Sequence, residues 1–182
     1  MKPLRLKMQA FGSYGKETTI DFEKVNQNLF LITGDTGAGK RRSLMRSFCF
    51  IWRSQLFFKQ KEGVVLQSQY VDFDSEPYVE LVFSEGRDEK RKIYTVRRVP
   101  RHLKTITRGA NKGKPKENTG SVSLIMPDGM EYPSKETDRK LQEIVGLTKS
   151  QFMQVAMIAQ GEFMDLLRAK SDDKKSDFSK AF

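Results

Sequence analysis

The sequence of 182 residues predicts an α/β fold with a mixed β-sheet. The apolar run at residues 28–33 lacks alternation, which is typical of a strand covered on both faces. A glycine-rich turn follows at residues 34–39, and apolar residues then recur at every fourth position across residues 44–56, as in a helix. Residues 78–99 add two strands of an antiparallel pair that turns near Gly86.

Shorter patterns indicate the remaining elements. Leu4, Leu6 and Met8 alternate with polar residues, which predicts a half-buried strand, and Pro-Asp-Gly at residues 127–129 predicts a hairpin turn. Gly146 follows a helical pattern and is a candidate for its end. We therefore expect strands at residues 1–11, 18–22, 121–126 and 130–132, and helices at residues 135–145 and 151–158.

The formal net charge of +10 comes mainly from residues 40–61 and 100–120. The second stretch is rich in Gly, Lys, Asn and Thr and lacks periodicity, so it predicts a mobile loop. His102, the single histidine, has no acid–base partner in the sequence and is expected to be a loop residue. A basic loop can bind DNA phosphates, and a solvated loop is the alternative. The candidate DNA contacts are Arg101, Lys104, Arg108, Lys112, Lys114 and Lys116.

Composition excludes several other classes of protein. The single cysteine, Cys49, rules out a disulfide framework and a thiolate metal cluster, and one histidine cannot build a two-histidine metal site. No apolar run approaches the roughly 20 residues that span a bilayer. We therefore expect a cytoplasmic protein that does not enter a membrane.

The glycine-rich turn has the spacing G-x-x-x-x-G-K between a predicted strand and a predicted helix, which is the context of a phosphate-binding loop, the Walker A motif. Its glycines let backbone N–H groups surround an anion, while the lysine reaches the β- and γ-phosphates. The candidate ATP-binding residues are Gly34, Asp35, Thr36, Gly37, Ala38, Gly39, Lys40 and Arg41. A Ser or Thr hydroxyl that ligates Mg²⁺ is expected after the lysine, and Arg41 cannot replace it.

Five segments closely resemble the SbcC family, the large SMC-like ATPase subunits of SbcCD exonucleases. The most specific is Gln-Phe-Met-Gln-Val-Ala-Met-Ile-Ala-Gln-Gly-Glu-Phe at residues 151–163. The others are residues 1–14, 33–40, 78–83 and 94–98. The resemblance implies the N-terminal lobe of an ABC/SMC-type P-loop ATPase head over residues 1–160, with an antiparallel β subdomain. It also implies the foot of a coiled coil over residues 161–182, cut short.

The same resemblance implies cofactors, partners and an activity. Gln160 matches the Q-loop glutamine that senses Mg²⁺ and the γ-phosphate, so ATP and Mg²⁺ are the expected cofactors. The signature motif and Walker B residues of this family lie in a C-terminal half of the head, and the heads dimerise. An SbcD-like nuclease subunit and DNA are the other expected partners. The implied activity is ATP hydrolysis within an exonuclease that processes DNA double-strand breaks and cleaves hairpins in DNA repair and recombination.

The sequence departs from the family between Arg41 and about Gln67. The family usually continues after the lysine with Thr-Thr-Ile-Phe-Asp-Ala-Ile. A reading frame shifted by one nucleotide converts codons for those residues into codons for the segment from Arg41 to Ser47. The alternative function is therefore a non-catalytic, truncated or frameshifted remnant that keeps the fold and binds nucleotide or DNA without turnover.

Overall fold

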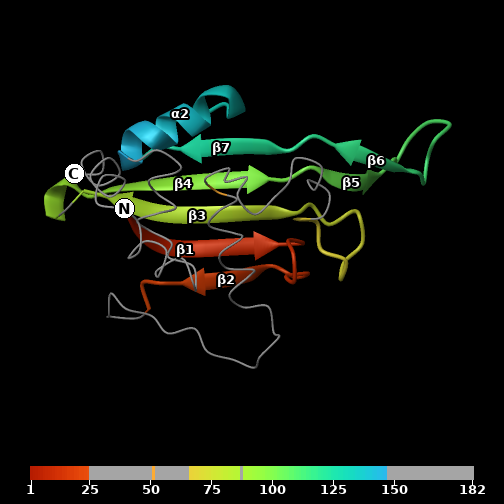
Figure 1. The fold of residues 1–182 in the computed structure, drawn as a ribbon, viewed down its shortest axis with the longest axis horizontal. Helices are drawn as coiled ribbons and strands as arrows, with labels where there is room; N and C mark the ends of the chain where they lie inside the picture. The colour runs from red at the N-terminus through yellow and green to blue at the C-terminus, as the bar shows by residue number, and fades with distance from the viewer. Residues whose placement is uncertain (25–50, 52–65, 87, 147–182) are drawn as a thin grey trace, which may run out of the picture.

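The structure is a computed structural model that describes residues 1–24, 51, 66–86 and 88–146. Within these residues a six-stranded sheet has the order β2-β1-β3-β4-β7-β8, helix α2 packs on one face, and a hairpin of β5 and β6 projects beyond the sheet (Figure 1). The bounds are β1 Lys2–Gln9, β2 Thr18–Asp21, β3 Tyr78–Glu85, β4 Lys92–Val99, β5 His102–Thr105, β6 Pro115–Asn118, β7 Ser121–Ile125, β8 Glu131–Tyr132 and α2 Ser134–Val145, with a short 3₁₀ turn at Asp88–Lys90.

The structure confirms the strands predicted at the N-terminus, over residues 78–99 and around the Pro-Asp-Gly turn. All pairings between the described strands are antiparallel, as expected for the β subdomain. The turn closes as predicted, since the backbone N–H of Met126 donates to the carbonyl of Met130 at 2.8 Å. The predicted central strand at residues 28–33 and the helix at residues 151–158 lie outside the described residues, as does the helix at residues 44–56 apart from Ile51.

One face of the sheet is apolar because side chains alternate along each strand. Leu6, Leu81, Val96 and Leu124 form a single register row across four strands, and each is fully buried. Phe83 lies on the same face and its ring stacks on Tyr94 with the centroids 5.4 Å apart. This face forms the core of the described part of the chain.

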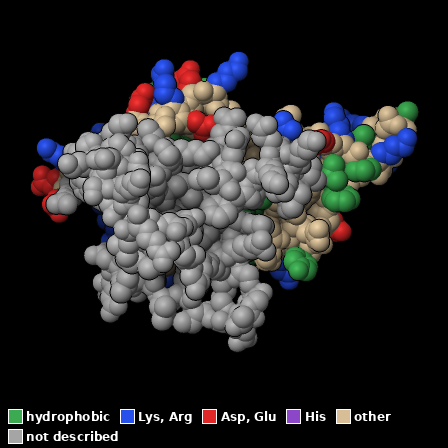
Figure 2. Space-filling view, in the orientation of Figure 1, with side chains coloured by type: hydrophobic (Ala, Val, Ile, Leu, Met, Phe, Trp, Pro, Cys, Tyr) green, Lys and Arg blue, Asp and Glu red, His purple; other side chains and the backbone are tan. Residues whose placement is uncertain are grey.

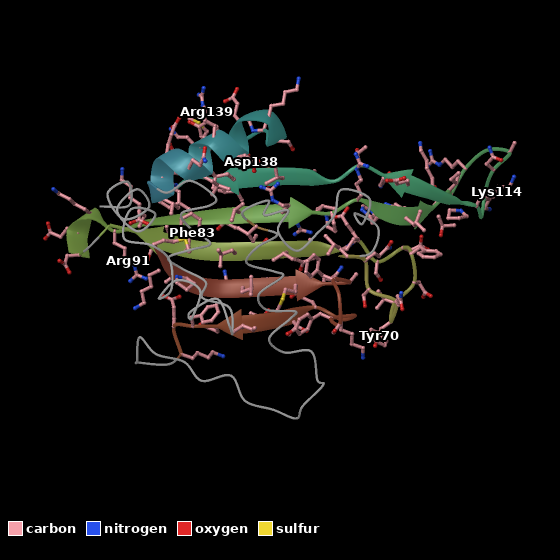
Figure 3. All side chains as sticks on the ribbon, viewed as in Figure 1. Tyr70, Phe83, Arg91, Lys114, Asp138 and Arg139 are labelled. Atoms are coloured by element: carbon pink, nitrogen blue, oxygen red, sulfur yellow. The ribbon has the colours of Figure 1, made fainter. Side chains whose placement is uncertain are left out.

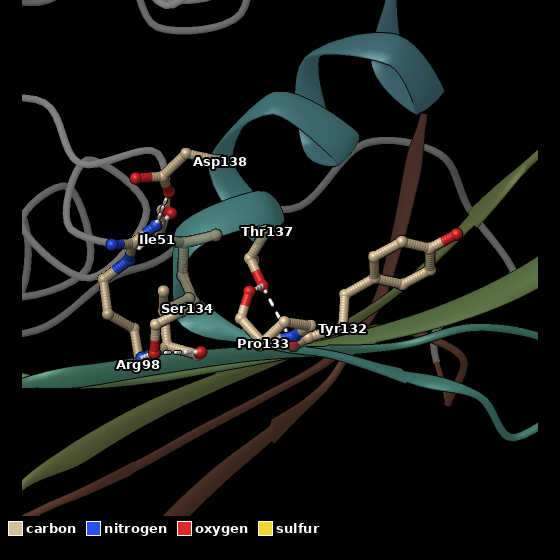
Figure 4. Close-up of polar contacts among 8 residues, drawn as sticks. Ile51, Arg98, Tyr132, Pro133, Ser134, Thr137 and Asp138 are labelled. Carbon is tan, nitrogen blue, oxygen red and sulfur yellow. Dashed lines mark hydrogen bonds and ion pairs between the residues drawn. The ribbon is translucent and has the colours of Figure 1, made fainter.

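Helix α2 covers part of the apolar face. Thr137 and Leu141, one turn apart, are its buried residues, and the Thr137 hydroxyl donates to the carbonyls of Tyr132 and Pro133 (Figure 4). The helix ends at Gly146, which adopts a left-handed φ of 71° and donates its N–H to the carbonyl of Gln142. The sequence pattern predicts the end of this helix at the same glycine, because that conformation favours glycine.

The outer edge of β7 is closed by a side chain. The Ser134 hydroxyl accepts a hydrogen bond from the Val122 N–H at 3.1 Å and donates one to the Val122 carbonyl at 2.8 Å. Two residues further along, Leu124 pairs with Tyr132 of β8. The backbone groups of Val122 are thus satisfied where β8 does not reach.

The opposite face of the sheet carries a charged row and a buried tyrosine. Lys7, Glu80 and Arg97 alternate in sign across three neighbouring strands. The Tyr78 hydroxyl donates to Glu17 Oε2 at 2.5 Å, and the Arg97 guanidinium lies 3.7 Å from the centre of the Tyr78 ring. Burial, followed by the hydrogen bond to Glu17, raises the pKa of Tyr78 to about 12.

This shift predicts how Tyr78→Phe changes stability with pH. The pKa of Tyr78 is 10.0 in the unfolded chain and about 12 in the folded chain, so the phenol loses its stabilising effect as pH rises through this window. The stability advantage of the wild type over Tyr78→Phe should therefore be constant below pH 10.0 and shrink above it. Urea unfolding across this pH range measures the stability difference. Tyr70→Phe is the control, because Tyr70 is 79% exposed. A difference that does not change with pH would contradict the assignment.

The prediction of a mobile loop over residues 101–120 is wrong. Residues His102–Thr105 and Pro115–Asn118 form the antiparallel strands β5 and β6. They continue β4 and β7, whose last pair is Val99 with Ser121, so the sheet sets their register although the residues themselves are polar. Gly120 sits at the junction, where a Cβ atom would lie 2.5 Å from the Val99 carbonyl oxygen.

Candidate functional site

The predicted ATP-binding residues and the predicted DNA-binding residues fall in different parts of the chain. Residues 34–41 and Gln160 lie outside the described residues, and so does the predicted coiled-coil foot at residues 161–182. All six candidate DNA contacts lie within the described residues, on the projecting hairpin. We call residues 101–120 the basic arm.

The basic arm presents its cations to solvent. Figure 2 shows blue side chains at its free end, and Figure 3 shows Lys114 pointing away from the sheet. The six exposed cations are Arg101, Lys104, Arg108, Lys112, Lys114 and Lys116. The structure therefore brings together on one two-stranded element the residues that the sequence pattern assigns to a loop.

The charges of the basic arm are poorly neutralised. Glu117 is its one acidic residue, and it lies 4.0 Å from Arg101, at the limit of an ion pair. Lys104 and Lys116 are directly opposite each other in the register of β5 and β6. Like charges at such a position destabilise a hairpin, so an anion between or beside them would be bound favourably.

The tip of the arm is a defined turn. Gly109 and Gly113 have φ angles of 85° and 86°, in the left-handed region that glycine adopts without strain. The Gly113 N–H donates to the Ile106 carbonyl at 2.8 Å, and the Ile106 N–H donates to the Lys114 carbonyl at 2.9 Å. The pairing of the two strands thus continues past the ends of β5 and β6.

The root of the arm is fixed by residues that sequence reasoning missed. The Gln67 side-chain amide donates to the Leu103 carbonyl at 3.0 Å and accepts from the Leu103 N–H at 2.9 Å. His102, expected in a loop, is instead 2% exposed in β5, and its Nδ1 lies 3.0 Å from the Pro100 carbonyl oxygen. Nothing in the local sequence signals the contact with Gln67, because the two residues are 36 positions apart.

A second polar site joins the sheet to α2. Arg98 lies on the apolar face of β4, and its side chain is 8% exposed. Its Nε donates to the Ile51 carbonyl at 3.2 Å, and its Nη2 forms an ion pair with Asp138 of α2 (Figure 4). This arginine therefore connects Ile51 with the sheet and the helix. The sequence carries a signal for the burial of Arg98, because it continues the alternation of the buried residues Tyr94 and Val96 along the strand.

Two other features are absent from the described part of the chain. It contains no group of three or more His, Cys, Asp or Glu side chains arranged to hold a metal ion. None of its helices has the length and apolar character needed to cross a membrane.

Comparisons with known proteins identify the family. The AAA domain family profile matches residues 5–182. The chain is 30% identical to the SbcC subunit of the nuclease SbcCD from Vibrio cholerae over 186 residues, covering 100% of this chain and 18% of the relative. It is also 30% identical to the corresponding protein from Staphylococcus aureus strain JH9, covering 96% of this chain and 17% of the relative. The chain therefore spans less than a fifth of these curated relatives.

A solved structure supports the predicted fold. A chain from work on "ATP-driven dimerization and DNA stimulated activation of SMC ATPases" aligns with a TM-score of 0.58 and 14% identity, with 100% of both chains covered. The fold is that of the N-terminal lobe of an ABC/SMC-type ATPase head. The chain belongs to the AAA domain family. Within that family it is an SbcC-like ATPase head segment, in agreement with the resemblance at residues 151–163 and elsewhere.

Proposed function

We propose that this chain is the N-terminal half of the ATP-binding head of an SbcC-like ATPase that acts with a nuclease subunit in DNA double-strand break processing and hairpin cleavage. The match to SbcC of Vibrio cholerae, which extends over the whole of this chain, carries this proposal. Residues 1–160 form the head lobe, and residues 161–182 begin a coiled coil. The C-terminal half of the head, a second head and an SbcD-like nuclease are the protein partners.

The nucleotide site has a phosphate-binding part and a metal-binding part. Residues 34–39 and Lys40 supply the backbone N–H groups and the ammonium that hold the phosphates of ATP. Gln160 senses Mg²⁺ and the γ-phosphate. The donor set fits the phosphates but not the metal at position 41, because the guanidinium of Arg41 carries no lone pair for a cation.

Arg41 favours a second candidate function, a non-catalytic head that binds nucleotide or DNA without turnover. In this function the positive side chain at position 41 compensates part of the phosphate charge. The lost protein ligand to Mg²⁺ removes the charge stabilisation that the metal gives to the transferring phosphoryl group.

An ATPase assay separates the two functions. Three forms of this chain are each mixed with the C-terminal half of an SbcC head. They are the unaltered chain, the Arg41→Thr variant, and a chain in which the family segment after Lys40 is restored. We expect ATP binding by all three and hydrolysis that is faster by on the order of 100-fold or more in the restored chain. Lys40→Ala is the control that should lose ATP binding. Rapid turnover by the unaltered chain would contradict the account of Arg41, and a lack of binding by all forms would contradict the nucleotide site.

In the proposed function the basic arm contacts the DNA backbone. Each lysine or arginine that neutralises a phosphate releases a counterion, so binding weakens as salt rises. The slope of log K against log salt should fall by about 0.9 for each contact that is removed. An unchanged slope after neutralising all six cations would exclude the arm from the interface.

A further inference from the structure

The basic arm has the shape of a groove-binding element. It consists of two paired strands, and paired strands lie about 4.8 Å apart. A four-residue strand such as β5 is about 14 Å long. The major groove of B-form DNA is about 12 Å wide and about 8.5 Å deep, and it admits a two-stranded ribbon. The arm is therefore narrow enough to enter this groove and long enough to reach its floor.

The cations are distributed to suit a groove with phosphates on both walls. Lys104 lies on β5 and Lys116 lies opposite it on β6. Three more cations lie nearer the tip. Arg108 follows β5, and Lys112 and Lys114 precede β6. Each strand thus carries one lysine, both on the same face of the ribbon, and the cations nearer the tip extend the positive charge on both sides of the turn.

The composition of the arm favours a duplex over a single strand. Residues 101–120 contain no Phe, Tyr or Trp, and proteins that bind single strands stack bases on such side chains. The tip combines three small residues, Gly109, Ala110 and Gly113, with the longer polar side chains of Arg108, Asn111 and Lys112. Lysines hold phosphates as point charges, and contacts to phosphates carry no base preference.

The root holds the arm in place before any ligand arrives. Gln67 makes two hydrogen bonds to the backbone of Leu103, and His102 is buried beside it. At the junction Gly120 allows the two strands to pass close to the Val99 carbonyl. A pre-ordered arm loses little conformational entropy on binding.

We propose that the basic arm enters the major groove of B-form duplex DNA as a rigid ribbon and binds the phosphates of both walls without reading sequence. This rests on the DNA contact of the proposed function and adds the kind of nucleic acid and the mode of binding. It predicts discrimination against A-form RNA duplexes, whose major groove is too narrow and deep for protein side chains.

The test measures the affinity of the full chain for three duplexes of one sequence. They are unmodified DNA, DNA with glucosylated 5-hydroxymethylcytosine, which fills the major groove and leaves the phosphates intact, and RNA. The variant is Lys104→Ala/Lys116→Ala. Its matched control is Lys90→Ala/Lys92→Ala, which removes two exposed lysines at the turn between β3 and β4, at the other end of the sheet (Figure 1).

On unmodified DNA the variant should bind about tenfold more weakly than the wild type at low salt, with a salt slope lower by about 1.8, while the control stays near the wild type. On glucosylated DNA and on RNA the wild type should bind as weakly as the variant binds to unmodified DNA. An equal loss of affinity by the variant on all three duplexes would place the arm outside the groove and overturn this inference, while the proposed DNA contact would stand. Wild-type affinity of the variant on every duplex would overturn both.

Discussion

Replacing Phe83 by alanine should lower the free energy of unfolding by about 3–5 kcal/mol. The Phe83 side chain is fully buried in β3 and stacks on Tyr94 of β4 (Figure 3). Truncation removes apolar contacts and leaves a cavity on the apolar face of the sheet, beside Tyr94, where the paired strands beneath it limit collapse. Urea or thermal unfolding followed by circular dichroism measures the loss.

Phe73→Ala is the control for Phe83→Ala. Phe73 is 49% exposed, so the same truncation should cost less than about 1 kcal/mol there. Equal losses at the two positions would show that the apolar face of the sheet does not form the core.

Replacing Asp138 by alanine should cost about 2 kcal/mol of stability. Arg98 lies in a register row with Met8, Val79 and Val122, all of them buried, so its charge has little access to water. Removal of the Asp138 carboxylate takes away an ion-pair partner and leaves that charge less compensated. The cost stays below that of a fully buried pair because the Asp138 side chain is 33% exposed.

Two further variants distinguish this charge effect from helix propensity. Arg139→Ala on the same helix removes a 79% exposed side chain from an ion pair with Glu143 and should change stability by about 0.5 kcal/mol or less. Arg98→Met/Asp138→Ala removes both charges and should recover part of the loss, since an apolar side chain suits the site. A double variant less stable than Asp138→Ala would contradict the role given to the ion pair.

The elements that could be predicted are those whose own residues carry the pattern. The alternation of Leu4, Leu6 and Met8 is enough to indicate a strand, and Pro-Asp-Gly at residues 127–129 is enough to indicate a hairpin turn. Gly146 marks the end of α2, because a left-handed residue there favours glycine. In each case the physical cause lies within a few residues of the feature.

The elements that could not be predicted depend on distant parts of the chain. β6 has the sequence Pro-Lys-Glu-Asn, which has little strand propensity, and it is a strand because β7 continues it and β5 pairs with it. The contact between Gln67 and Leu103 joins positions 36 apart. At the candidate site, the identity of the six cations was therefore predictable, but their arrangement on two paired strands was not.

The closed edge of β7 limits how this chain can associate with others. A strand edge with free backbone groups invites a strand from another molecule, which leads to aggregation or to exchange of segments. The Ser134 hydroxyl bonds both the N–H and the carbonyl of Val122, and Tyr132 of β8 pairs with Leu124 two residues further along β7. At these positions of β7 a second copy of the chain therefore finds no free backbone groups to which a strand could add. A single hydroxyl at the start of a helix thus helps to keep the sheet from growing into a neighbouring molecule.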